Sequence, residues 1–425
     1  MRKCIDLESQ PGFQSIYAPQ MQQAIDRGLA GHSGTGVVDW GYADLGITTR
    51  PTRKPDRGEP IPEKLPPDHY NVVNPVRLGR GEYWDYLFNT FATPEFRLVA
   101  NKFPAPQIKV SNEGGYFDPN TRGTYGTIYT PKGSDTDITT FFHEYGHYLD
   151  NVIGFKIQGL DNNTWQNYSQ ILKASEGFVD AMIADGKALG LVLDNSAYWK
   201  YLFDNGLDTT FKGNKTFKIS KGLNEEEISQ KMQGGDFWRV MEEILTRSKK
   251  DVADIKNTKN PDPVKLKRAE EIYANITNLY DQHLNSVKIA KEISAKVFST
   301  KLGTVKRGRE LDGGIWRHPG AIGDIIEALT SGDLTDYEIA TGDYFMMGSH
   351  GPGYYSTRLY REKGKWITRN HNMQVAENFK RYEIFAQLTQ FMAHQDNTAM
   401  DIMKELMPNL VKSYEKIIKD AQITV

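Results

Sequence analysis

The residues from 143 to 147 read His-Glu-Tyr-Gly-His, and this spacing can build a metal site. Successive residues of an α-helix are about 100° apart, so His143 and His147 lie on one helix face. Two imidazoles on one face are a typical part of a zinc site, and Glu144 lies at its edge. Zinc lowers the pKa of a bound water towards ~7, and a neighbouring carboxylate can accept the proton. The segment therefore predicts one Zn²⁺ ion and metal-assisted hydrolysis, with Glu144 as the general base.

A hydrolytic zinc site needs a third protein ligand and leaves a fourth position to water. Cys4 is the single cysteine of the chain, which excludes a site built from cysteines. The candidates are two glutamates on predicted helices, Glu383 and, as the alternative, Glu176. Glu383 begins a polar stripe that continues at Gln387 and further along an otherwise apolar helix. Such a stripe suits the wall of a site and equally a solvent-exposed face, so periodicity alone leaves the choice open.

Two local elements must position the histidine pair. The segment from about 137 to 152 is predicted to be the helix that carries both histidines. Just before it, the β-rich residues Thr127, Ile128 and Tyr129 predict a substrate-binding edge strand, to which an extended peptide adds by main-chain hydrogen bonds. Asp150, shortly after the second histidine, is predicted to support a ligand histidine from the second coordination sphere.

The rest of the chain divides by composition. Residues 1–80 are rich in Gly, Pro and polar groups and predict an extended N-terminal arm. Residues 81–425 predict one domain, in which 224–255 and 263–300 are long, charged helices. These helices predict a large insertion over about 200–320, between the two parts of the site. The expected fold class is α+β and mainly helical, with a small mixed sheet, an active-site helix and this helical insertion.

Composition restricts the function classes. A formal net charge of -2 gives no excess of basic residues for binding nucleic acid. The N-terminus has basic residues but no apolar run behind them, which excludes a signal peptide, and no later stretch is a transmembrane candidate. We therefore expect no nucleic-acid partner and no membrane attachment, and a cytoplasmic or virion-packaged protein.

The His-Glu-Tyr-Gly-His segment together with Glu383-Ile384-Phe385-Ala386 resembles the zincin domain of anthrax lethal factor. The chain is also similar to the zincin domains at the ends of phage minor head proteins, particularly over 323–330 and 348–355. The resemblance covers roughly 120–152 and 320–420. It implies a zincin-like, gluzincin-type metallopeptidase fold.

By position, the resemblance implies that Glu383 is the third zinc ligand. It implies that Gln387 occupies the place where related domains often have a glutamate that holds a ligand histidine. A tyrosine that stabilises the transition state in lethal factor has no obvious counterpart here. Its candidates are His350, Tyr354 and Tyr355, in or beside a glycine-rich loop.

The expected function is that of a zinc metalloendopeptidase with a protein or peptide substrate, in a phage or mobile-element setting. Two alternatives remain open. One is a structural virion protein that keeps the zincin fold with little activity and contacts capsid or portal proteins. The other is an injected or secreted effector toxin.

Overall fold

The structure is a computed structural model that describes residues 72–424 apart from short internal stretches, and β1 (Gly31–His32) paired with β2 (Val38–Asp39) before them. The stretches outside the description are 79–81, 112–114, 120–124, 132–137, 161–172, 193–195, 211–215, 224–226, 229–231, 233, 306–313, 347–353, 356–358, 363–364 and 369–372.

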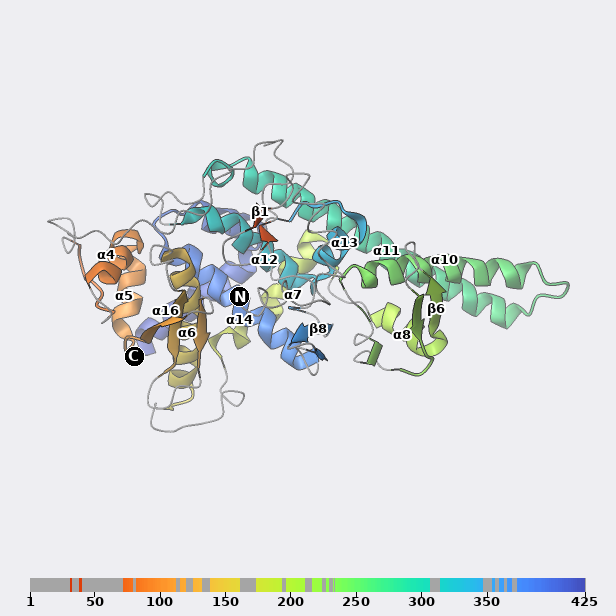
Figure 1. The fold of residues 1–425 in the computed structure, drawn as a ribbon, viewed down its shortest axis with the longest axis horizontal. Helices are drawn as coiled ribbons and strands as arrows, with labels where there is room; N and C mark the ends of the chain where they lie inside the picture. The colour runs from red at the N-terminus through yellow and green to blue at the C-terminus, as the bar shows by residue number, and fades with distance from the viewer. Residues whose placement is uncertain are drawn as a thin grey trace.

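The described protein is mainly helical, with small sheets, and its larger hydrophobic core draws on both ends of the described chain (Figure 1). The N-terminal elements of this body are α4 (Glu82–Phe91), α5 (Pro94–Lys102), β3 (Gln107–Ser111), β4 (Tyr116–Asp118), β5 (Thr127–Pro131), α6 (Ile138–Ile157), the 3-10 helix η2 (Ala174–Phe178) and α7 (Val179–Leu189). The C-terminal elements are η3 (Lys301–Gly303), η5 (Ile315–Arg317), α12 (His318–Leu329), α13 (Asp333–Thr341), β8 (Leu359–Glu362), β9 (Lys365–Thr368), α14 (Met373–Ala393), α15 (Thr398–Leu406) and α16 (Pro408–Thr424).

Aromatic side chains fix α6 against the two N-terminal helices. The ring of Phe88 lies 5.5 Å from Phe142 and 5.8 Å from Tyr145, centroid to centroid. Phe96 contacts the same two rings, and all four side chains are almost completely buried. Truncating a buried aromatic residue costs about 3–5 kcal/mol, so this cluster holds the helix of the histidine pair firmly.

The sheet beside α6 has the order β3-β5-β4, in which β3 pairs parallel and β4 pairs antiparallel with β5. Thr127, Ile128 and Tyr129 thus lie in the central strand, and the prediction that they form an edge strand was wrong. The error arises because β propensity identifies a strand but carries no information on its neighbours. The edges of this described sheet are β3 and the three-residue β4, which sequence analysis did not identify.

A second hydrophobic core occupies the middle of the chain. It is built by α8 (Ser196–Asn205), the hairpin of β6 (Leu207–Thr210) and β7 (Thr216–Ile219), α10 (Asp236–Lys256) and the first half of α11 (Pro263–Phe298). Asp262 caps α11 by accepting hydrogen bonds from two backbone amides, and Pro263 starts the helix. The second half of α11 belongs to the larger core, so this one helix joins both.

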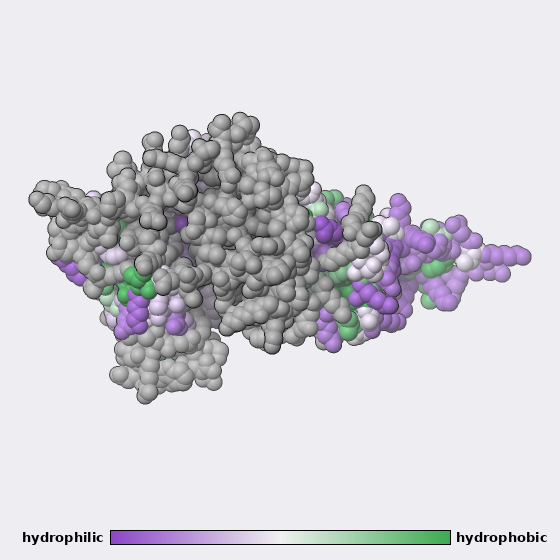
Figure 2. Space-filling model, in the orientation of Figure 1, coloured by the Kyte–Doolittle hydropathy of each residue, from purple (hydrophilic) through white to green (hydrophobic). Residues whose placement is uncertain are grey.

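The far end of the α10–α11 pair projects from the body and is hydrophilic (Figures 1 and 2). No residue from 249 to 275 is buried. The pair therefore extends well beyond the core that holds its base. None of the described helices is long and apolar enough to cross a membrane.

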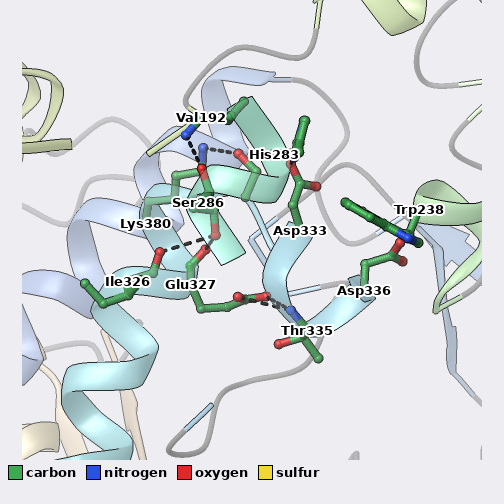
Figure 3. Close-up of polar contacts among 12 residues, drawn as sticks. Val192, Trp238, His283, Ser286, Ile326, Glu327, Asp333, Thr335, Asp336 and Lys380 are labelled. Carbon is green, nitrogen blue, oxygen red and sulfur yellow. Dashed lines mark hydrogen bonds and ion pairs between the residues drawn. The ribbon is translucent and has the colours of Figure 1, made fainter. Parts of the chain in front are cut away.

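Buried carboxylates join the two cores at the turn between α12 and α13 (Figure 3). Asp336 accepts hydrogen bonds from the amides of Gly235 and Trp238 at the start of α10. Glu327 accepts from the amide of Thr335. Since these acceptors satisfy helix-start amides that would otherwise be buried without partners, α13 fixes the base of α10 against α12.

Candidate metal centre

The predicted histidine pair lies on one face of α6, as its spacing requires. The rings of His143 and His147 are 4.8 Å apart between centroids and stand almost perpendicular. Both side chains are largely but not completely buried, with 13% and 17% of their surface exposed. Their two Nε2 atoms are therefore available to a common partner that remains open to solvent.

That partner residue comes from α14, which packs on α6 more closely than ordinary side chains allow. A Cβ atom added to Gly146 would lie 2.6 Å from the Cα of Ala386 and 2.9 Å from the Cβ of Thr389. Only a glycine at this position of α6 permits the contact. The close approach brings Glu383, one turn before Ala386 on α14, to the histidine pair.

The distances from Glu383 to the two histidines are close to those of a tetrahedral zinc site. Oε2 of Glu383 lies 3.4 Å from Nε2 of His143 and 3.7 Å from Nε2 of His147. Two ligand atoms bound at about 2.1 Å to one tetrahedral ion are about 3.4 Å apart. The donor set of two imidazole nitrogens and one carboxylate oxygen is that of known catalytic zinc sites. Within the described residues this is the one group of His, Cys, Asp and Glu close enough to hold an ion, with all three donor atoms within 4.8 Å of one another.

The electrostatics around the pair favour a cation. Burial acts to lower the pKa of His143, but the carboxylates of Glu383, Glu144 and Asp324 outweigh it and raise the pKa to about 9. The protein thus surrounds this imidazole with negative charge. A divalent cation would balance that charge in place of a proton.

Glu144, the predicted general base, is buried beside the pair, and its charge acts on His143. Tyr354 also reaches the group, because its hydroxyl donates a hydrogen bond to Oε1 of Glu383. Of the predicted transition-state groups, Tyr354 therefore lies at the ligand carboxylate, whereas His350 lies outside the described residues. Tyr355 is buried and hydrogen-bonds to Asp324.

Sequence analysis missed Asp324, which α12 places at the back of the site. Its side chain is 3% exposed, and Oδ2 accepts a 2.9 Å hydrogen bond from Nε2 of Gln387. Gln387 was predicted to contact a ligand histidine, and its amide nitrogen donates this hydrogen bond to the carboxylate of Asp324. A lone aspartate inside an apolar helix was the signal available, since a buried carboxylate needs partners.

The alternative ligand, Glu176, has a different partner. Its carboxylate forms a two-pronged ion pair with the guanidinium of Arg381, with a 3.1 Å bond from Nη2 to Oε1. The structure brings Glu383, and not Glu176, to the histidine pair. An arginine so placed satisfies both oxygens of the carboxylate.

Asp150 was predicted to support a ligand histidine, and this prediction was wrong. Its two carboxylate oxygens accept hydrogen bonds from the amide and the hydroxyl of Ser175, at 2.8 and 2.9 Å. Asp150 therefore fixes the start of η2 on α6. The prediction rested on closeness to His147 along the helix, but both oxygens of Asp150 are taken by Ser175, which packs on α6 from a segment that helix periodicity does not reveal.

Comparisons with protein-family models, with curated proteins and with solved structures gave no match to this chain.

Proposed function

We propose that the protein is a zinc-dependent metallopeptidase whose ion is held by His143, His147 and Glu383. The observation that carries the proposal is the set of three donor atoms within 4.8 Å of one another, brought from two helices to one place beside a buried glutamate. When bound, zinc would polarise the peptide carbonyl and acidify a water molecule.

The residues around the ion have distinct roles in this proposal. Glu144 accepts the proton of the attacking water and passes it to the amine that leaves. Tyr354 orients Glu383 through its hydrogen bond. If that hydroxyl turned from Glu383 to the substrate, its single proton would stabilise the negative charge that develops on oxygen.

The proposed substrate is a peptide in extended conformation. The short strand β4 is antiparallel to its neighbour, lies at an edge of the described sheet and packs near α6. A peptide chain can add to such an edge by main-chain hydrogen bonds. We therefore assign the role predicted for β5 to β4.

Metal analysis and peptide cleavage test the proposal together. The purified full-length chain should contain about one zinc ion per molecule and cleave members of a proteome-derived peptide library, read by mass spectrometry. Glu144→Gln should keep the zinc and lower the cleavage rate by about 10²–10⁴-fold, because general-base catalysis typically contributes that factor. His143→Ala should lose both. Zinc-free wild-type protein, or undiminished cleavage by Glu144→Gln, would contradict the proposal.

A structural role in a virion is the second candidate. The hydrophilic far end of the α10–α11 pair, whose residues 249–271 belong to neither core, suits contact with a capsid or portal partner. The Glu144→Gln variant separates the candidates, because a structural protein would assemble and function unchanged with it. The phage or mobile-element setting rests on the sequence resemblance. The effector alternative rests on the predicted N-terminal arm of residues 1–80, most of which lies outside the described residues.

A further inference from the structure

Two buried polar atoms at the back of the site have no hydrogen-bond partner among the described residues. They are Nδ1 of His143 and Oε1 of Gln387. A histidine that binds a metal through Nε2 carries its proton on Nδ1, which is then a donor. The amide oxygen of glutamine is an acceptor. The two atoms are therefore complementary, and buried polar atoms are rarely left without partners.

The way α6 packs on α14 places His143 and Gln387 at the same level along the two helices. Gly146 of α6 meets Ala386 and Thr389 of α14, and the ring of Phe142 lies 6.4 Å from that of His394. Passing backwards along α6 thus means passing forwards along α14, so the helices are antiparallel. Gln387, one turn after Glu383, is consequently level with His143.

Asp324 decides which end of the Gln387 amide faces the histidine. Because Oδ2 of Asp324 accepts from Nε2, the amide nitrogen points to α12 and the amide oxygen points away from it. The hydroxyl of Tyr355 donates to the same aspartate and holds it in place. The charge of Asp324 also acts on the ring of His143, although the two residues belong to different helices.

We propose that Asp324 is a positioning residue of the metal site, which acts on the ligand His143 through the amide of Gln387. With zinc on Nε2, the amide oxygen accepts the proton of Nδ1, a bond that the structure does not contain, and the carboxylate of Asp324 supplies the negative charge that makes the imidazole a stronger ligand. This inference rests on the proposed zinc site and adds to it a residue from α12.

The test measures zinc affinity and does not depend on activity. Apo protein is titrated with Zn²⁺ against a chromophoric chelator, and Co²⁺ is bound in parallel to record its visible absorption. Asp324→Asn keeps the shape and the hydrogen-bond acceptor but removes the charge. We expect zinc to bind about 10-fold or more weakly to this variant and the Co²⁺ spectrum to shift, since outer-shell substitutions cost 10–100-fold in affinity.

Two variants separate positioning from general damage. Glu327→Gln is the control for a buried acidic side chain of α12, because Glu327 lies one turn further along this helix and accepts a hydrogen bond from the amide of Thr335. It should leave zinc affinity unchanged. The double variant Asp324→Asn/Gln387→Glu returns a charge directly to the position that faces His143 and should restore the affinity, which a merely structural role of Asp324 would not produce.

Gln387→Met serves if Asp324→Asn does not fold. It removes the amide between Asp324 and His143 and should weaken zinc binding by a similar factor. Wild-type protein that binds neither Zn²⁺ nor Co²⁺ overturns the proposed function, and this inference with it. Wild-type protein that binds zinc, with Asp324→Asn or Gln387→Met binding equally tightly, overturns this inference alone.

Discussion

His143 is the residue at which burial and charge oppose each other most clearly. A buried imidazole normally loses its proton more easily, yet three surrounding carboxylates raise its pKa to about 9. The pKa in the folded apo protein therefore exceeds the unfolded value of about 6.5. By linkage, the protonated imidazole stabilises the apo fold fully below pH ~6.5, and this contribution is lost as the pH rises through about 9.

Zinc affinity should consequently depend on pH. A metal must displace the proton of His143, so we expect the affinity to rise by up to about tenfold per pH unit between ~6.5 and 9 and to level off above. Calorimetric titration at pH 7.5 in buffers of different ionisation enthalpy should show about one proton released per ion from this residue. Binding without proton release at that pH would contradict the arrangement of charges described here.

Single residues also show how far sequence could predict the site. The spacing of His143 and His147 on one helix face was sufficient to predict their pairing, because helix periodicity is a local property. The stripe that starts at Glu383 was compatible with solvent or with a site. The structure buries its members: Glu383, Gln387, Gln390 and His394. Asp324 could be noticed as an aspartate inside an apolar helix, but its role could not be predicted, since that role arises from the packing of α12 on α14.

The crossing of α6 and α14 is the element on which the site depends. Gly146→Ala should push the helices apart, because the new Cβ would meet the Ala386 backbone at 2.6 Å. We expect a loss of about 1–3 kcal/mol in the free energy of unfolding and a weaker zinc site. Gly177→Ala is the matched control, since its Cβ would meet only Ile417, at 3.6 Å. Chemical denaturation and zinc titration measure both variants, and equal behaviour of the two would show that the crossing is not tight.

Elements were predicted better than their arrangement. The helix that carries the histidines and the long helix at 263–300 were found from local patterns and agree with α6 and α11. The order of the strands was not predicted, because β5 inserts between two strands that both precede it in the chain, and such pairing is non-local. The three residues of β4 were too few to show a period. The choice of β4 as the proposed substrate-binding strand therefore depends on the arrangement of the strands in the structure.

At the scale of the whole molecule, acidic side chains hold the two cores together at α13. Glu338 is buried and accepts hydrogen bonds from the amides of Phe345 and Met346. Burial raises the pKa of Glu338, and separately that of Glu327, to about 8. Both groups therefore bind a proton more tightly in the folded state than in the unfolded state.

The raised pKa values of Glu327 and Glu338 set the pH dependence of stability. The protonated side chains stabilise the fold fully below the unfolded pKa of about 4.5, and this stabilisation is lost as the pH rises through about 8. We expect the apo protein to lose stability over that range. Glu338→Gln and Glu327→Gln should flatten the loss, measured as denaturation midpoints by tryptophan fluorescence. A variant with the pH profile of the wild type would show that the carboxylate is already ionised in the fold.

The projecting pair of helices should be dispensable for the metal site. Replacing 250–271 by a short Gly/Ser turn removes no buried residue. We expect zinc affinity to be unchanged and the melting temperature to shift by only a few degrees, because neither core is altered. Calorimetry and zinc titration check this. A lost metal site would mean that the projection stabilises the body in a way that its exposure does not indicate.

A crystal structure of the zinc-loaded protein, with anomalous scattering recorded at the zinc edge, tests the central proposal most directly. We predict one ion within about 2.2 Å of Nε2 of His143, Nε2 of His147 and a carboxylate oxygen of Glu383, with Glu144 beside it. Glu176 should remain paired with Arg381. An ion bound elsewhere, or held at the histidine pair without Glu383, would contradict the proposed metal centre.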